Sequence, residues 1–274
     1  MAIRIVQSKQ NPRVKELRAA LLRPGRGNAE VVALEGFHLV QEALRSGLTF
    51  ETIFLAQNNE NLLNELGLPD SVEILVLPEE ILASAVTTET PQPIAALARP
   101  LTWKWPDLLG HSPSQTLIVV LAGIQDPGNL GTILRSAEAF GATGAISLPG
   151  TVSHWNPKAM RASAGSIFRL PILATSESDC FTQLHESRIQ TLAAMAHEAQ
   201  PLCEVDLAMP VALVIGAEGS GLSPELAAQC SARITIPCPG PVESLNAAVA
   251  ASILLYEASQ QRALAKTVQI RRKS

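Results

Sequence analysis

The segment Leu117–Ala122 constrains the fold most, because it is an unbroken apolar run, LIVVLA. A strand with only apolar side chains must be covered on both faces, which is typical of a parallel sheet with helices on each side. Apolar residues at helical spacing follow in Leu130–Phe140. The sequence therefore predicts an α/β fold in which strands and helices alternate.

The rest of the second half repeats this alternation. Further strands are predicted at Ala145–Leu148, Ile189–Met195, Val211–Ile215 and Arg233–Ile236, and a last helix at Leu245–Ser259. Such an order gives a largely parallel sheet, and ligands of these sheets bind beyond the carboxyl ends of the strands. The loops after Ala122, Ile215 and Ile236 are therefore the candidate functional loops.

The first half predicts a smaller α/β unit. Its expected helices are Asn11–Leu22 and Gly36–Arg45, and its expected strands are Val31–Leu34, Thr52–Leu55 and Val72–Val76. Prolines then accumulate between Pro91 and Pro113, and proline continues neither a helix nor a central strand. We therefore expect a domain at 1–100, a linker at 101–115 and a second domain at 116–274.

The charge distribution is uneven. The net charge of −4 counts weakly against a nucleic-acid binder, yet seven basic residues and one acid lie between Arg4 and Arg26. These charges mark either a phosphate-binding patch or an ordinary solvated helix face. The four cysteines form no CxxC pair, and the chain begins without a long apolar segment. We expect no structural metal, no membrane span, no signal peptide and a reducing cytoplasm.

The first candidate loop, Gly123–Gly131, leads into a helix that carries Arg135. Asp126 suits the N-cap and Pro127 the first helical position, so an ordinary strand-to-helix turn is the simplest interpretation. Asn129 and Arg135 are six residues apart, about 240° around a continuous helix. They can converge on one ligand only if Asn129 precedes the regular helix.

The other two loops carry glycines and prolines. Ile215–Pro224 has three glycines around Glu218, without the GxGxxG or GxxxxGK[ST] fingerprints of nucleotide loops, and Ser223 with Pro224 is simplest as a helix start. In Ile234–Asn246, prolines stiffen the loop, Ser244 is expected to be an N-cap, and Asn246 can face a ligand at the helix N-terminus.

Together, these loops resemble the SpoU (TrmH) family of RNA ribose methyltransferases. The matching segments are Asp126–Gly141 (D-P-x-N-x-G-x-x-x-R-x-A-x-x-F-G), Ile215–Leu222 (I-G-x-E-x-x-G-L) and Ile236–Ala250 (I-P-x-x-G-x-x-x-S-L-N-x-x-V-A), together with Asn156–Gly165, which ends in R-A-S-x-G. The first hundred residues resemble, more loosely, an L30e-like substrate-binding domain, through Ser8–Lys15 and Leu34–Gly36.

The resemblance implies a fold and a cofactor. It implies a SPOUT-like catalytic domain with a deep trefoil knot that holds S-adenosylmethionine, in a homodimer with the active site at the interface. The reaction is 2'-O-ribose methylation of RNA, with 23S ribosomal RNA first and transfer RNA second. A non-catalytic RNA-binding or ribosome-assembly factor on the same fold and a nucleotide-dependent oxidoreductase are the alternatives; the target nucleotide and a role in antibiotic resistance stay open.

The resemblance also implies residue roles. The catalytic candidates are Asn129, Arg135, Glu218, Ser244 and Asn246. The cofactor candidates are Gly216, Glu218, Leu222, Ile236 and Leu245. The RNA-binding candidates are Lys9, Arg13, Lys15, Lys158, Arg161 and Arg169. Cys238 departs from the family pattern, in which methionine is frequent at this position, and is expected to alter packing rather than chemistry.

Overall fold

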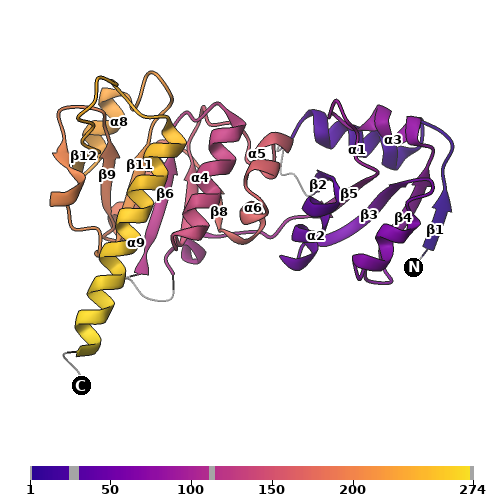
Figure 1. The fold of residues 1–274 in the computed structure, drawn as a ribbon, viewed down its shortest axis with the longest axis horizontal. Helices are drawn as coiled ribbons and strands as arrows, with labels where there is room; N and C mark the ends of the chain where they lie inside the picture. Colours follow the sequence, from indigo (N-terminus) through magenta and orange to yellow (C-terminus); the bar gives the residue numbers. More distant parts are fainter. Residues whose placement is uncertain (1, 25–30, 111–114, 272–274) are drawn as a thin grey trace. The chain divides into compact units, whose positions relative to one another are not determined.

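The computed structural model of the chain describes residues 2–24, 31–110 and 115–271. They form two compact units, each with its own sheet (Figure 1). One unit comprises the residues up to Thr102 together with Ser153–Arg169, and the other comprises Trp103–Val152 and the residues from Leu170 onward. The predicted α/β class is confirmed in both units.

The first unit has a five-stranded mixed sheet in the order β1-β4-β3-β5-β2. Its strands are β1 (Ala2–Ile5), β2 (Val32–Glu35), β3 (Thr49–Ala56), β4 (Glu73–Leu77) and β5 (Ile94–Arg99). Strands β1, β4 and β3 pair in parallel, whereas β5 runs antiparallel to both β3 and β2. Strands β1 and β5 were not predicted, and β5 lies directly after Pro93 in the proline-rich stretch.

Helices cover this sheet. They are α1 (Pro12–Leu22), α2 (Phe37–Arg45) and α3 (Glu79–Ala85). The unit also contains a short 3-10 helix η1 (Glu60–Glu65) and, within Ser153–Arg169, the helices α5 (Pro157–Ala162) and α6 (Ser166–Arg169). Asn11 caps α1, because its side chain accepts a hydrogen bond from the N–H of Arg13. One core cluster joins α1 and α3 to the sheet around Leu17, Phe54 and Leu82.

The second unit has a seven-stranded sheet in the order β10-β12-β9-β11-β6-β7-β8, and its neighbouring strands all pair in parallel. Its strands are β6 (Leu117–Leu121), β7 (Gly144–Ser147), β8 (Ile172–Ala174), β9 (Gln190–Ala194), β10 (Gln200–Pro201), β11 (Val211–Ile215) and β12 (Ala232–Thr235). This confirms the predicted parallel sheet; the short strands β8 and β10 were missed. The knot stays a prediction.

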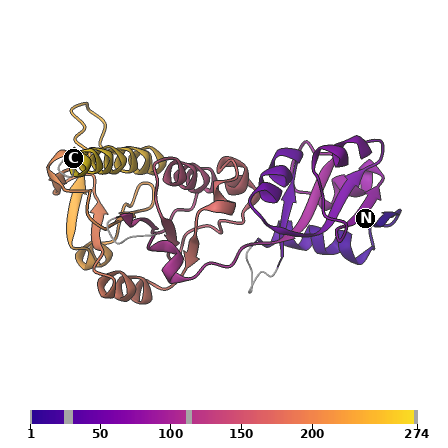
Figure 2. The same ribbon diagram turned by 90° about the horizontal axis from the view of Figure 1, so that it is seen from below.

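Helices lie on both faces of this sheet. They are α4 (Pro127–Ala139), α7 (Glu177–Glu186), α8 (Pro224–Gln229) and α9 (Ala247–Arg271), with 3-10 helices η2 (Trp105–Leu108) and η4 (Leu202–Glu204). Figure 2 shows α4 and α9 along one face and α7 on the other. The residues of β6 and β11 are fully buried between these layers, as their apolar runs require.

Part of the expected linker belongs to the second unit. Leu108 is fully buried in the core of that unit, and Trp105 Nε1 donates a hydrogen bond to Ser187 Oγ at 3.1 Å. The second unit therefore begins at Trp103, whereas the sequence predicted its start at residue 116.

Candidate cofactor and catalytic site

The three candidate loops meet at one edge of the second sheet. They follow β6, β11 and β12, and these strands run parallel to one another within the contiguous order β12-β9-β11-β6. Parallel strands bring their carboxyl ends to the same edge. The loop after β9 lies at this edge too, although it was not among the predicted functional loops.

Local hydrogen bonds fix the loop after β6. Thr151 Oγ1 accepts hydrogen bonds from the N–H groups of Gly123 (3.0 Å) and Ile124 (3.3 Å) and donates one to the carbonyl of Leu121. Asp126 caps α4 by accepting from the N–H of Asn129, so the predicted cap is confirmed. Asn129 therefore lies in the first turn of α4. Convergence of Asn129 and Arg135 on one ligand required Asn129 to precede the helix, so this condition is not met.

The loop after β11 is a tight turn closed by Ala217 and Gly221, which exchange two backbone hydrogen bonds. A Cβ atom at Gly216 would lie 2.3 Å from the carbonyl carbon of Gly221, a distance that no real contact allows. Gly219 and Gly221 have φ angles of 83° and 66°, which favour glycine. The glycines thus fold the backbone back on itself and project Glu218 from the turn.

Asn246 caps α9 at the end of the third loop. Its Oδ1 accepts hydrogen bonds from the N–H groups of Ala248 (2.9 Å) and Val249 (3.2 Å). The helix begins at Ala247, so the expected N-cap at Ser244 was wrong by two residues. The cap fixes the orientation of the Asn246 amide, so that its Nδ2 points away from the helix.

Three side chains from the three loops form one hydrogen-bonded network. Asn246 Nδ2 donates to Glu218 Oε1 at 2.6 Å and to Asn129 Oδ1 at 3.3 Å. Asn129 Nδ2 also donates to Glu218 Oε1. Two amides therefore hold the carboxylate of Glu218 and fix its direction. This is the kind of preorganised polar site that can orient a reacting hydroxyl group.

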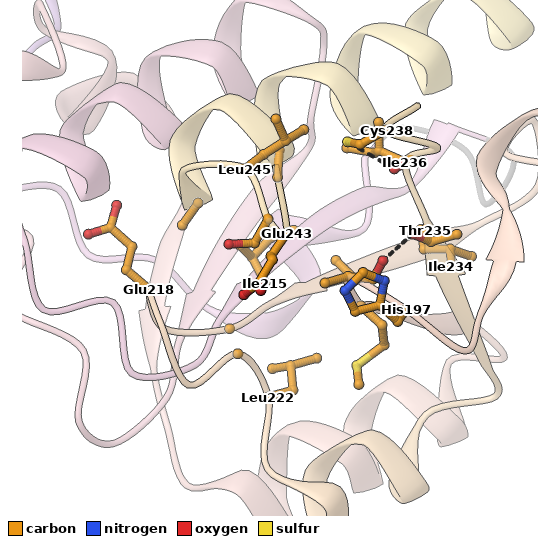
Figure 3. Close-up of a pocket in the computed structure, with 18 of the residues that line it drawn as sticks. His197, Ile215, Glu218, Leu222, Ile234, Thr235, Ile236, Cys238, Glu243 and Leu245 are labelled. Carbon is orange, nitrogen blue, oxygen red and sulfur yellow. Dashed lines mark hydrogen bonds between the residues drawn. The ribbon is translucent and has the colours of Figure 1, made fainter. Parts of the chain in front are cut away.

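A cavity of about 880 Å³ adjoins the network. Figure 3 shows its walls: Ile215 and Leu245 on one side, Ile234 and Thr235 on another, and Leu222 below. All the cofactor candidates line it, namely Gly216, Glu218, Leu222, Ile236 and Leu245, and so does Ser244. Glu218 belongs both to the cavity wall and to the network, so a ligand in the cavity would end beside the network.

Three acidic or histidine side chains of the cavity wall were not predicted from the sequence, namely His197, Glu198 and Glu243. The first two follow β9, whose position between β12 and β11 could have been expected to bring its loop to this edge. Glu243 directly precedes the catalytic candidate Ser244, and this adjacency in the sequence could have indicated that Glu243 lies at the site.

Arg135 is not part of this arrangement. It is exposed on α4, and the hydrogen bonds of the network involve only Asn129, Glu218 and Asn246. Since Asn129 is already helical, the six residue steps from Asn129 to Arg135 rotate Arg135 about 240° around the helix axis. Four of the five catalytic candidates thus lie in the network or the cavity wall, and Arg135 does not.

The RNA-binding candidates differ in their surroundings. Arg13 Nη1 bonds to Glu16 (2.8 Å) and Glu51 (3.1 Å), and the hydrogen bond with Glu16 is the largest cause of the raised pKa of Arg13. Arg169 pairs with Glu42 at 2.8 Å. The remaining candidates are exposed: Lys9, Lys15, Lys158 and Arg161. Arg13 and Arg169 are therefore engaged by carboxylates that compete with phosphate.

Within residues 2–24, 31–110 and 115–271, no group of three or more His, Cys, Asp or Glu residues is placed to hold a metal ion. None of the described helices combines the length and the apolar character needed to span a bilayer.

Comparison with known proteins adds the family. The profile of the SpoU rRNA Methylase family matches residues 116–256, and that of the MRM3-like substrate binding domain matches residues 11–96. The first match covers all three loops of the site. The second covers most of the first unit's sheet.

Individual relatives span nearly the whole chain. An uncharacterized tRNA/rRNA methyltransferase of Synechocystis is 35% identical over 96% of both chains. The 23S rRNA (guanosine(2553)-2'-O)-methyltransferase RlmP of Bacillus subtilis is 29% identical over 92% of this chain and 97% of its own. The SpoU methyltransferase AviRb of Streptomyces viridochromogenes, solved with AdoMet, superposes with a TM-score of 0.84 at 26% identity, covering 92% of this chain and 98% of its own.

Proposed function

Because the chain belongs to the SpoU rRNA methylase family, we propose that it methylates a ribose 2'-hydroxyl of RNA with S-adenosylmethionine, in the cytoplasm, and that 23S ribosomal RNA is its substrate. The observation that carries this proposal is the Asn129–Glu218–Asn246 network at the rim of the cavity. A cofactor in the cavity and an RNA strand outside it would meet at Glu218. Transfer RNA is the second substrate candidate.

The cavity fits the cofactor by its chemistry. Its apolar walls, with Leu222, Ile236 and Leu245, suit an adenosine, and Gly216 brings backbone close to the ligand because no side chain fits there. When bound, S-adenosylmethionine supplies a methyl group already activated on a sulfonium. The protein therefore has two tasks: to align the 2'-oxygen with that methyl group and to assist the loss of the hydroxyl proton.

The network residues perform the alignment. In the reaction the 2'-oxygen takes the methyl group of S-adenosylmethionine, S-adenosylhomocysteine remains with the sulfur electron pair, and the hydroxyl proton passes to solvent water. Asn129 and Asn246 orient the carboxylate of Glu218, and Ser244 lies on the same cavity wall. Arg135 would bind the neighbouring phosphate and help the proton to leave, while staying protonated itself.

The position of Arg135 requires a second copy of the chain. Helices α4 and α9 pack together, with Ser136 Oγ and Ser252 Oγ 2.8 Å apart. An apolar stripe, Val249, Ile253 and Tyr256, is exposed along α9. The three residues share one helix face, and Tyr256 on that face packs edge-to-face against Phe140 at the end of α4. We propose a homodimer in which each copy covers this stripe and supplies Arg135 to the network of its partner.

Mixed dimers test the arrangement. Arg135→Ala and Asn129→Ala variants, each inactive alone, should regain about a quarter to a half of the activity when mixed, because one site then holds both intact groups. No regain after subunit exchange contradicts a shared site. Sedimentation of Ile253→Asp should show monomers, whereas Leu264→Asp, at another exposed apolar position of α9, should stay dimeric.

The activity itself is tested with labelled methyl. Label from S-adenosylmethionine should enter unmodified 23S ribosomal RNA, and Arg135→Ala should abolish it. Transfer to tRNA alone would move the substrate to the second candidate. A protein that binds RNA but never the cofactor would contradict the enzymatic proposal and favour an RNA-binding factor.

RNA binding is proposed to use the exposed basic residues. Lys9, Lys15 and Arg161 would contact phosphates, and Lys158, Arg13 and Arg169 would exchange their present partners for phosphate. Each lost phosphate contact should lower the slope of log affinity against log salt by about one. Lys15→Gln should therefore flatten that slope, and Glu65→Gln, an exposed acid on η1, should not. Equal slopes in Lys15→Gln and the wild type would remove Lys15 from the interface.

A further inference from the structure

The proposed cofactor cavity carries acidic side chains that are not part of the hydrogen-bonded network. The acidic side chains among its described lining residues are Glu198, Glu218 and Glu243; His197 and Cys238 are the other ionisable ones, and no lysine or arginine is among them. Glu218 already accepts hydrogen bonds from two amides. Glu198 and Glu243 add negative charge beyond what aligning a hydroxyl group requires.

Glu243 lines the cavity, so its negative charge acts on a ligand bound there. Figure 3 shows it on the side of the pocket that Ile215 and Leu245 form, with His197 on the side of Ile234 and Thr235. Glu243 is three residues before Asn246, so their Cα atoms are at most about 11 Å apart. This is close to the Debye length of about 10 Å at 0.1 M ionic strength, so salt only partly screens the charge of Glu243 from charge near Asn246.

The two states of the cofactor differ in charge. S-adenosylmethionine carries a sulfonium, an ammonium and a carboxylate, and its net charge is +1. After methyl transfer the sulfur is a neutral thioether, and S-adenosylhomocysteine has a net charge of zero. The charge is therefore lost at the methyl-bearing end, which under the proposed function faces the RNA and so lies near Glu218, at the rim of the cavity that Glu243 also lines.

We propose that Glu243 is a specificity residue that distinguishes the cofactor from its by-product by charge, so that the cavity attracts S-adenosylmethionine and releases S-adenosylhomocysteine. This inference rests on the proposed function. The carboxylate attracts the sulfonium while the methyl group is present and loses that attraction once sulfur is neutral. Shape contributes little to this choice, because the two ligands differ in size by one methyl group.

The test measures the two dissociation constants by calorimetry on the full-length dimer, without RNA. In Glu243→Gln, S-adenosylmethionine should bind roughly 3- to 10-fold more weakly, the effect of one unit charge in a partly solvated site, and S-adenosylhomocysteine should change less than twofold. Sinefungin, which carries an amine cation near the sulfonium position, should behave like S-adenosylmethionine. Glu243→Asp should restore most of the difference, and raising salt should reduce the ratio of the constants in the wild type.

The matched control is Glu225→Gln. Glu225 is an exposed acid in the first turn of α8, outside the cavity lining, and its replacement changes the net charge equally. It should leave both dissociation constants unchanged. An equal loss for both ligands in Glu243→Gln, or no loss, overturns the charge-based role while labelled methyl transfer by the wild type still upholds the proposed function. Binding of neither ligand by the wild type overturns both.

Discussion

Asn246 Nδ2 donates a hydrogen bond to Glu218 Oε1 at 2.6 Å, while Oδ1 of the same amide accepts from the N–H groups that begin α9. One side chain therefore ties the direction of a helix to the position of a carboxylate in another loop. The cap orients the amide, and the oriented amide orients Glu218. Asn246 therefore has two separate roles: its Oδ1 caps α9, and its Nδ2 orients Glu218.

Asn246→Asp should remove the functional role and keep the cap. An aspartate still accepts from the backbone N–H groups but places a negative charge against Glu218. We expect an unchanged melting temperature within about 2 °C and a fall in methyl transfer of roughly 10²-fold, because a misplaced site loses alignment. Asn246→Ala should lose activity and also about 1 kcal/mol of stability, which chemical denaturation measures. Full activity in the aspartate variant would remove Glu218 and Asn246 from the site.

Gly216→Ala should prevent the loop after β11 from closing. Its Cβ atom would lie 2.3 Å from backbone of Gly221, so the turn must open and the cavity wall must shift. We expect S-adenosylmethionine binding to fall by at least about tenfold in calorimetry. Gly240→Ala is the matched control, since nothing lies within 4 Å of its added Cβ atom. Equal affinity in the two variants would contradict the close approach.

Arg262 should contribute strongly to the stability of the second unit. Its guanidinium donates to the carbonyls of Leu207, Gln115, Thr116 and Met209 at 2.7 to 2.9 Å, and burial lowers its pKa. Arg262→Leu would leave these carbonyls without their donor, at a cost of about 3 kcal/mol or more in the free energy of unfolding.

The control for this change lies one turn further along α9. Lys266 is exposed, and Lys266→Leu should alter the free energy of unfolding by less than about 0.5 kcal/mol. Urea denaturation measures both variants. A difference of less than about 1 kcal/mol between them would show that solvent replaces the guanidinium at those carbonyls.

Acid should destabilise the fold through His154. Burial lowers the pKa of His154 from 6.5 to about 4, and its ring lies against Trp155 with centroids 4.7 Å apart. Between these two values the unfolded chain binds a proton that the folded chain does not. The free energy of unfolding therefore falls as pH falls from about 6.5 to about 4, by at most about 1.4 kcal/mol per pH unit from this group.

Urea denaturation at pH 7.5, 6 and 5 measures this slope. His154→Phe removes the titrating group and should flatten the dependence relative to the wild type, whereas the same change at the exposed His38 should leave it as it is. Parallel curves for the wild type and His154→Phe would show that His154 is protonated in the folded state.

Local patterns predicted much of the fold. The apolar runs located β6 and β11, and Asp126 with Pro127 located the start of α4. Strands β1, β5, β8 and β10 were missed, because short strands carry little periodicity and depend on their neighbours in the sheet. The cap of α9 was misplaced because a serine and an asparagine two residues apart are equally good N-caps in sequence.

The sequence by itself determined the α/β class, the functional loops and the residues that enter them, since apolar spacing, capping residues and ordered motifs act over a few residues. Only the tertiary structure decided how these residues meet. Asn129 lies 89 residues from Glu218 and 117 from Asn246, and the parallel sheet order brings the three together. The tertiary structure also leaves Arg135 outside this network. The helix α4 begins before Asn129, and the helical rotation between Asn129 and Arg135 separates the two side chains.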